Sequence, residues 1–215
     1  LHQRQTPFLT VTRMVFGADG VLYAAEGSGE KQKSIVAITD QNQVRTVCSE
    51  IDGVSLGKLD VNITPAGNDG LYVLDCESQN LFYINFSGDG YRIANLQELG
   101  ITAEMIAACP ISGDIYIMAN YHLLLMDSDG NFVQLGEAIC GDPWGMVVSN
   151  DGQKLHIAES GAVITVFLPQ QQLSDLRMTA SSETTQGLES ANVILPNVEE
   201  SLTRNNDWPL IGTMI

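Results

Sequence analysis

The sequence predicts an all-β fold assembled from repeated sheet units, and three observations lead to that prediction. Short apolar segments alternate with turns rich in Asp and Gly over most of the 215 residues. The same order of segments recurs four times, at intervals of roughly 40–45 residues. No window keeps apolar residues at helical spacing over three turns, because Asp-Gly pairs interrupt every candidate helix.

Each unit begins with a short apolar strand and turns at a pair of Gly and Asp residues, which tolerate the positive φ of tight hairpins. These pairs are Asp19-Gly20, Asp69-Gly70, Gly113-Asp114 and Asp151-Gly152. The second strand carries an aromatic or histidine side chain in register, at Tyr23, Tyr72, Tyr116 and His156. The third strand is rich in β-branched and aromatic residues, at 35–38, 81–86, 123–126 and 163–167.

A second turn and a fourth strand end the first three units. Four short strands per unit are typical of a β-propeller blade. We therefore predict a β-propeller-like domain over residues 1–169, with four-stranded blades at about 13–47, 58–96, 104–136 and 143–169. The blades form either a closed small ring or part of a larger one. The last unit has only three strands, and residues 8–12 would complete it and remove an exposed edge.

Two stretches resemble a known superfamily. The segments PWGMVVSNDGQKLHIAES, from Pro143, and GNDGLYVLDCESQNLFYINFSGDG, from Gly67, resemble the hairpins of NHL-repeat, YVTN and gluconolactonase-like propellers. The resemblance covers residues 13–169 and implies a blade of the six-bladed type. Because propellers host many unrelated functions, it is specific for the fold and weak for activity.

The aromatic or histidine residues of the four second strands form what we call the Tyr/His column. Three residues after it, carboxylates recur at Glu26, Asp75 and Glu159, whereas the third unit has Ala119 there, followed by Asn120. Converging oxygens suit a hard cation such as calcium, which takes six to eight oxygen ligands. Alternatively, acidic side chains at this position accept backbone hydrogen bonds in the following turn.

The resemblance bears on this site, because gluconolactonase-like enzymes hold their metal with a Glu, an Asn and an Asp. Their Asn often stands in a Pro-Asn-Gly triplet, and the matching triplet here is Pro143-Trp144-Gly145. At the equivalent point the first unit has Thr12-Arg13-Met14 and lacks the Glu with which the family's set of metal ligands begins. Of the family's three metal ligands, the resemblance therefore implies only Glu159 in this chain. No nucleophile elbow, zinc-protease, dinucleotide or phosphate-loop motif occurs. We therefore predict no catalytic residue and no cofactor other than calcium.

The charge excludes two classes of partner. Ten Lys and Arg against 26 Asp and Glu give a net charge of −16, which repels nucleic acid and anionic membrane surfaces. The longest apolar stretch, at 162–168, is far shorter than the roughly 20 residues of a membrane-spanning helix.

Cysteines and sequons bear on location. Cys48, Cys76, Cys109 and Cys140 allow two disulfides or, equally, four small buried hydrophobes. Asn62 and Asn85 open Asn-X-Ser/Thr triplets, which are compatible with secretion. No apolar segment like that of a signal peptide follows Leu1. We expect a secreted, periplasmic or cell-surface protein, with the cytoplasm left open.

The composition changes in the tail, residues 170–215. A polar linker rich in Ser, Thr and Gln leads to apolar islands at 192–196 and 207–215. The tail either packs back onto its own propeller or adds to a neighbour's sheet. Trp144 is either buried against the next blade or a binding platform at the rim. The candidate partner-binding residues are Trp144, Trp208, Leu210 and Ile211.

The sequence thus predicts a non-catalytic propeller that binds a protein partner or assembles with itself through its tail. One alternative is a calcium-dependent gluconolactonase-like hydrolase. Another is a sensor propeller that binds a small molecule or glycan in a pocket lined by Trp144 or Tyr121.

Overall fold

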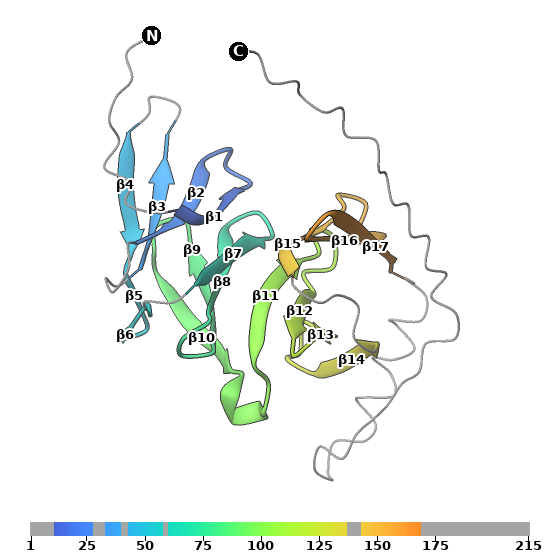
Figure 1. Cartoon of the computed structure of the whole chain (residues 1–215). Helices are drawn as coiled ribbons and strands as arrows, with labels where there is room; N and C mark the ends of the chain where they lie inside the picture. The colour runs from blue at the N-terminus through green and yellow to red at the C-terminus, as the bar shows by residue number, and fades with distance from the viewer. Residues whose placement is uncertain (1–10, 28–32, 40–42, 58–59, 137–142, 169–215) are drawn as a thin grey trace, which may run out of the picture.

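The computed structural model describes residues 11–27, 33–39, 43–57, 60–136 and 143–168 (Figure 1). Over these residues the chain forms four antiparallel blade sheets, which follow one another along the sequence, and one small two-stranded sheet; the blades confirm the predicted all-β propeller architecture. The first three blades have four strands each, and the described part of the fourth has three.

Blade 1 consists of β1 (Val11–Phe16), β2 (Leu22–Glu26), β3 (Ser34–Ile38) and β4 (Val44–Cys48). A small hairpin of β5 (Glu50–Ile51) and β6 (Val54–Ser55) follows it. Blade 2 consists of β7 (Val61–Ala66), β8 (Gly70–Asp75), β9 (Asn80–Asn85) and β10 (Gly90–Asn95), and a 3-10 turn, η1 (Gln97–Leu99), leads out of it. Blade 3 consists of β11 (Ala103–Ala108), β12 (Ile115–Ala119), β13 (His122–Met126) and β14 (Phe132–Gly136). Blade 4 consists of β15 (Pro143–Val148), β16 (Lys154–Glu159) and β17 (Ala162–Phe167).

Each blade is a meander whose turns use the predicted Asp and Gly residues. Gly20, Gly113 and Gly152 have φ values of 78°, 76° and 67°, in the left-handed region that glycine adopts without steric cost, whereas Gly70 begins β8 and Gly67 supplies the positive φ of the turn in blade 2. In the first turn, the Asp19 carboxylate accepts a hydrogen bond from the Tyr23 hydroxyl at 2.8 Å. The turn and the aromatic column are therefore directly linked in blade 1.

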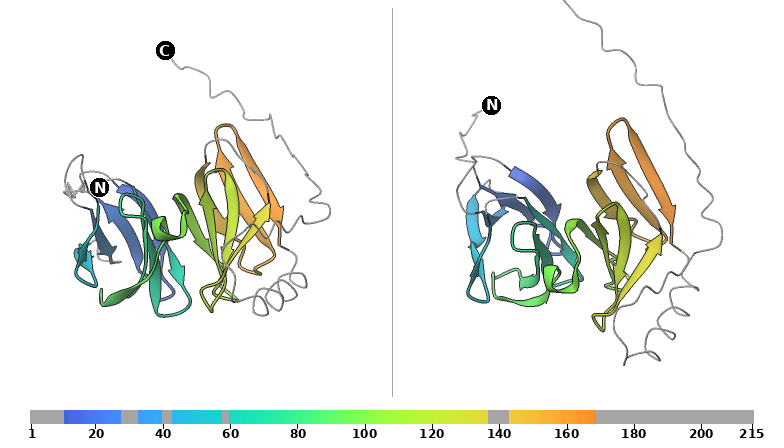
Figure 2. Two further views of the ribbon diagram at one scale, coloured as in Figure 1. Left: turned by 90° about the horizontal axis from the view of Figure 1, so that it is seen from below. Right: turned by 60° about the horizontal axis from the view of Figure 1, so that its bottom comes forward.

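The first strands of the blades lie side by side in an open arc. Strand β1 packs beside β7, β7 beside β11, and β11 beside β15 (Figure 2). Strands β15 and β1 have no comparable packing, so the four described blades do not close a ring by themselves. Over the described residues the structure therefore shows an open arc and not a closed four-bladed ring.

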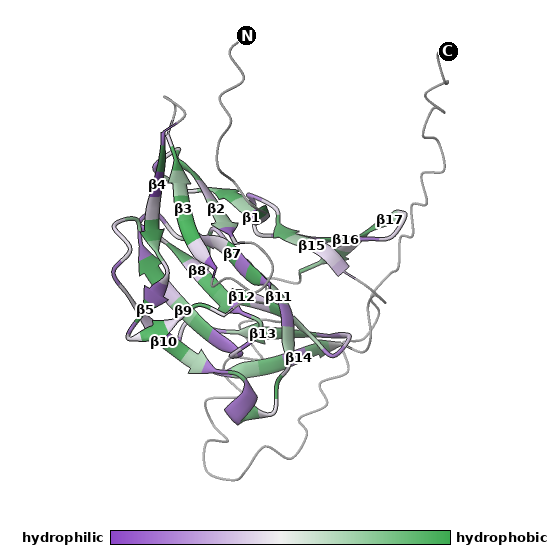
Figure 3. Ribbon diagram, turned by 60° about the vertical axis from the view of Figure 1, so that its left-hand side comes forward, coloured by the Kyte–Doolittle hydropathy of each residue, from purple (hydrophilic) through white to green (hydrophobic). Residues whose placement is uncertain are grey.

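Three apolar cores join the blades, one between each successive pair. Tyr23 and Ile35 of blade 1 meet Ile63 and Phe82 of blade 2 in the first core. The second core joins blades 2 and 3, and the third joins blades 3 and 4. Hydrophobic residues run through the strands of every blade, blade 1 included (Figure 3). Burial of both sheet faces explains why the internal strands are so strongly apolar.

The two ends of the arc differ from its middle. Strands β7 and β11 are almost wholly buried, whereas β1 exposes Met14 and Phe16, and β15 exposes Trp144 and Val147. An inner strand is therefore buried only where a blade packs on both of its sides.

Three details of the sequence interpretation change. Cys48, Cys76 and Cys109 are free thiols, so the structure forms none of the disulfides that these three residues allowed, and Cys140 lies outside the described residues. The Asn62 side chain is buried and hydrogen-bonded, which leaves no accessible amide for glycosylation. Val11 and Thr12 begin β1 and pair with blade 1, not with the last sheet.

The rest of the segment that was expected to complete the last blade, residues 8–10, lies outside the described residues, as does the tail, 170–215. Trp208, Leu210 and Ile211 belong to that tail, and assembly through it stays a prediction. Among the described residues, no helix is long and apolar enough to cross a membrane.

Candidate functional site

Three of the four inner strands carry a β-bulge at the same position near their start. Register shifts lie between Val11 and Arg13, between Ala103 and Met105, and between Pro143 and Gly145. The extra residues are Thr12, Glu104 and Trp144, whereas β7 pairs with β8 without a shift. Bulges re-aim side chains and are frequent at barrel rims and beside binding sites. We call this end of the arc the inner-strand rim.

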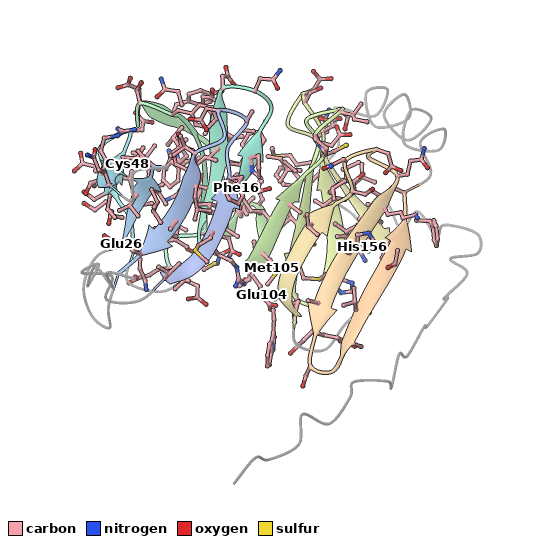
Figure 4. The ribbon with its side chains drawn as sticks, turned by 90° about the horizontal axis from the view of Figure 1, so that it is seen from above. Phe16, Glu26, Cys48, Glu104, Met105 and His156 are labelled. Atoms are coloured by element: carbon pink, nitrogen blue, oxygen red, sulfur yellow. The ribbon has the colours of Figure 1, made fainter. Side chains whose placement is uncertain are left out.

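A hydrogen-bonded chain crosses three inner strands at this rim. The Arg13 Nε donates to Asn62 Oδ1 at 2.8 Å, and the Asn62 Nδ2 donates to the Glu104 carbonyl oxygen at 2.9 Å. The backbone oxygen of the bulged Glu104 is therefore held by blade 2, while its side chain is exposed. Figure 4 places Glu104 and Met105 near the centre of the arc.

The Cys76 thiol lies beside this chain, where the Asn62 Nδ2 donates to its sulfur at 3.4 Å. The pKa of Cys76 is raised to about 11, chiefly by burial and to a smaller extent by the Asp60 and Asp75 carboxylates, while the Asn62 hydrogen bond and Arg13 act in the opposite direction. Burial likewise raises the pKa of Cys48 to about 11. Neither thiol is the low-pKa thiolate that nucleophilic catalysis requires.

The three predicted metal ligands occupy equivalent positions, because Glu26, Asp75 and Glu159 each pair with the residue at the start of the inner strand. The structure does not gather them. Within the described ranges, no three His, Cys, Asp or Glu side chains are placed to hold a metal ion. Figure 4 places Glu26 on the outer side of blade 1, away from Glu104.

Asp75 makes the local hydrogen bonds that were expected as the alternative to metal binding. Its fully buried carboxylate accepts from the Gly57 and Glu77 backbone amides at 2.9 and 3.0 Å and from the Ser78 hydroxyl at 2.8 Å. These donors satisfy both oxygens, so the charge is stabilised within the protein.

Two large aromatic side chains are exposed near the rim. Trp144 is 62% exposed on the bulge of β15, which agrees with a binding platform and not with burial against a blade. Tyr121 is 51% exposed in the two-residue turn between β12 and β13, where it and Asn120 have positive φ values of 66° and 49°. Two successive residues with positive φ indicate a type I′ turn, which projects its side chains beyond the sheet.

The described histidines have neutral partners. The His156 Nδ1 lies 3.0 Å from Thr165 Oγ1, and the His122 Nδ1 lies 3.3 Å from Gln134 Nε2. A histidine general base is oriented by a carboxylate in the familiar triad, and neither of these contacts supplies one.

Comparison with known proteins supports the fold alone. No family model and no curated protein matches the chain. Among solved structures, it is similar to an auxiliary nutrient-binding protein from Bacteroides ovatus (TM-score 0.58, 16% identity, 77% of this chain and 40% of that one). It is also similar to a calcium-binding regucalcin from Agrobacterium tumefaciens (0.56, 13%, 80% and 58%) and to virginiamycin B lyase from Staphylococcus aureus (0.53, 13%, 76% and 54%).

These neighbours are β-propeller proteins, in agreement with the predicted fold, whereas the six-bladed type stays a prediction. The aligned part spans about half the length of the solved structures it matches, from 40% to 60%. They include an auxiliary nutrient-binding protein and a protein described as a putative gluconolactonase, so the fold is compatible with binding and with catalysis.

The sequence located Trp144 but not its neighbours. The triplet Pro143-Trp144-Gly145 drew attention because of its likeness to a family motif. Thr12 lies in the triplet of the first unit that was matched with this motif, but no residue pattern singled out Thr12 or Glu104 as a bulge, because a bulge depends on the register of two strands.

Proposed function

We propose that this propeller is a non-catalytic binding module that holds a protein partner at the inner-strand rim, in an extracytoplasmic location. The exposure of Trp144 on a bulge is the observation that carries the proposal, because Trp is enriched in protein interfaces relative to the rest of the protein surface. Aromatic side chains of this kind are common hot spots of protein interfaces.

The neighbouring strand suggests the chemistry of the partner. Glu104 is exposed at the equivalent bulge of β11, which packs directly beside β15. A carboxylate next to an indole face suits a Lys or Arg side chain, through an ion pair and a cation–π contact. The net charge of −16 attracts a basic segment over longer range.

Tryptophan fluorescence tests this proposal. The chain has two tryptophans, so Trp208→Phe leaves Trp144 as the single reporter. We expect a lysine-rich peptide to change its emission and a glutamate-rich peptide of equal length to leave it unchanged. Glu104→Gln should weaken the binding of the lysine-rich peptide about threefold, which is the effect of losing one exposed ion pair.

Glu98→Gln is the matched control, because Glu98 is an exposed carboxylate on η1 and its loss changes the net charge equally. It should leave the affinity within error of the Trp208→Phe parent. Equal weakening by both substitutions would mean unspecific charge attraction, and an unchanged emission with both peptides would remove the rim as the binding site.

A calcium-dependent hydrolase is the second candidate, favoured by the equivalent positions of Glu26 and Glu159. A regucalcin described as calcium-binding is among the structural neighbours. Bound calcium would raise the melting temperature by mass action, and Glu159→Gln would abolish that rise. A melting temperature that is the same in millimolar calcium and in chelator would remove this candidate.

A further inference from the structure

Blade 2 carries three tyrosines in a row near the turn between β7 and β8, which is the end of the blade away from the inner-strand rim. Tyr72, Tyr83 and Tyr91 lie on β8, β9 and β10 and face one another across the strands. The ring centres of Tyr72 and Tyr83 are 6.2 Å apart, and those of Tyr83 and Tyr91 are 5.4 Å apart. Half of the chain's six tyrosines thus form one aromatic surface, which we call the tyrosine row.

The tyrosine row is specific to blade 2. The equivalent cross-strand rows are Tyr23, Ala37 and Arg45 in blade 1, Tyr116, Leu125 and Val133 in blade 3, and His156 and Thr165 in the described part of blade 4. Tyr23 and Tyr116 are each 1% exposed, because they lie in the cores between blades. Tyr72 is half-buried, and Tyr91 is 57% exposed. The propeller fold therefore does not require three tyrosines at this point, and it leaves them partly accessible.

The middle ring of the row is held in place from two sides. A Cβ atom added at Gly70 would lie 2.8 Å from a carbon of the Tyr83 ring, so this ring rests directly on the glycine backbone. The Tyr83 hydroxyl donates a hydrogen bond to the carboxylate of Asp69, which lies in the exposed turn. The ring is thereby oriented before any ligand arrives, which lowers the entropic cost of binding.

The charged groups beside the tyrosine row are acidic. The pKa of Tyr72 is raised, chiefly by burial and then by Tyr91. The Asp69 and Asp114 carboxylates act on Tyr72 in the same direction, which places both of them near the rings. Arg92 lies on the other face of β10, where its cross-strand neighbour belongs to the core between blades 1 and 2. Aromatic faces bordered by carboxylates attract a positive charge.

We propose that the tyrosine row binds an organic cation that carries a quaternary ammonium group. The ring faces attract the positive charge, and the methyl groups of the cation add apolar contact with the rings. A quaternary ammonium has no N–H group, so contact with ring faces leaves no hydrogen-bond donor without a partner, as it would for a lysine. The row lies at the other end of the strands from the inner-strand rim, so this proposal is independent of the partner proposed there.

Choline is the probe that tests the proposal, with the proton NMR signal of its methyl groups as the readout. Ring currents shift the signal of a group above an aromatic face upfield, so we expect a saturable upfield shift as protein is added. The uncharged analogue of choline, in which carbon replaces the nitrogen, has the same shape and should show no comparable shift. Ethanolamine, which keeps three N–H groups, should compete poorly with choline.

Substitutions locate the binding site. Tyr91→Leu keeps an apolar side chain and removes the ring, so the affinity for choline should fall about threefold, the effect of one exposed cation–π contact. Tyr91→Phe keeps the ring face and should retain the affinity. Asp69→Asn removes a negative charge in an exposed turn and should also weaken binding. Tyr121→Leu is the matched control, because Tyr121 is 51% exposed but lies in the turn between β12 and β13.

Each of four results would overturn the proposal. Equal shifts for choline and its uncharged analogue would indicate an apolar patch with no preference for a cation. Equal weakening by Tyr91→Leu and Tyr121→Leu would mean unspecific contact with exposed rings. Binding that Trp144→Leu abolishes and Tyr91→Leu leaves intact would place the cation at the inner-strand rim. A methyl signal that stays at its free position in millimolar protein would exclude binding. Should Tyr91→Leu unfold, Asp69→Asn tests the same site.

Discussion

At the scale of single residues, the polar side chains between the blades are structural links. Gln79 is the clearest of them: it is buried, with a positive φ of 55°, in the turn between β8 and β9. Its amide accepts from the Ala103 amide at 2.6 Å and donates to the carbonyl oxygens of Ala103 and Cys76 at 3.1 and 2.8 Å. One side chain thereby fixes the start of β11 against blade 2.

Gln79→Ala should therefore lower the free energy of unfolding by about 2–4 kcal/mol, because it leaves buried backbone groups of Ala103 without partners. Urea denaturation measures the loss. Gln43→Ala removes an exposed amide of the same kind and should change stability by less than about 0.5 kcal/mol. Equal losses in the two variants would contradict the assigned role of Gln79.

The buried thiols predict that the stability of the fold depends on pH. Burial raises the pKa of Cys48 and Cys76 from 9.0 to about 11, so the folded protein holds their protons where the unfolded chain releases them. Their contribution to stability is full below pH 9 and is lost as the pH rises towards 11. Burial and the Asp19 hydrogen bond also raise the pKa of Tyr23, which acts in the same direction.

Thiol labelling at pH 8 measures this effect. The thiolate is the reactive form, and a pKa two units higher reduces it about 100-fold, so Cys48 and Cys76 should react about 100-fold more slowly than in urea-unfolded protein. Labelling of both thiols at the rate of the unfolded chain would show that they are not buried as described.

At the scale of elements, the sequence predicted the hairpins well and the bulges not at all. The Asp-Gly pairs and the Tyr column determined the strand register, because each is a local signal that repeats in every unit. The short hairpin of β5 and β6 was missed, since two-residue strands have no periodicity. The rim was only partly predictable, because Arg13, Asn62 and Glu104 meet across three separate blades.

Close strand approach makes Gly70 a sensitive position. A Cβ atom added there would lie 2.2 Å from the Ile84 carbonyl oxygen, so β8 and β9 would have to separate. Gly70→Ala should cost about 3 kcal/mol of stability. In Gly145→Ala, the nearest atom is the Ala158 Cβ at 3.9 Å, an ordinary contact, and we expect little change. Thermal melts of the two variants that coincide would contradict the pairing of β8 with β9.

At the scale of the whole molecule, the described residues form an open arc of four blades whose inner strands lie side by side. Blade count could be predicted because the repeat is internal to the sequence. Closure could not, since an open and a closed arrangement differ only in what packs against the outward faces of the first and last blades. The apolar residues there, such as Phe16 and Val163, have the same character as residues that other blades cover.

The fluorescence of Trp144 in the Trp208→Phe variant, titrated with a lysine-rich peptide, tests the central claim most directly. A partner-binding rim predicts a saturable change in emission, with an affinity that Glu104→Gln lowers and Glu98→Gln leaves unchanged. An emission that stays constant over the titration, or an equal loss of affinity in both variants, would contradict it.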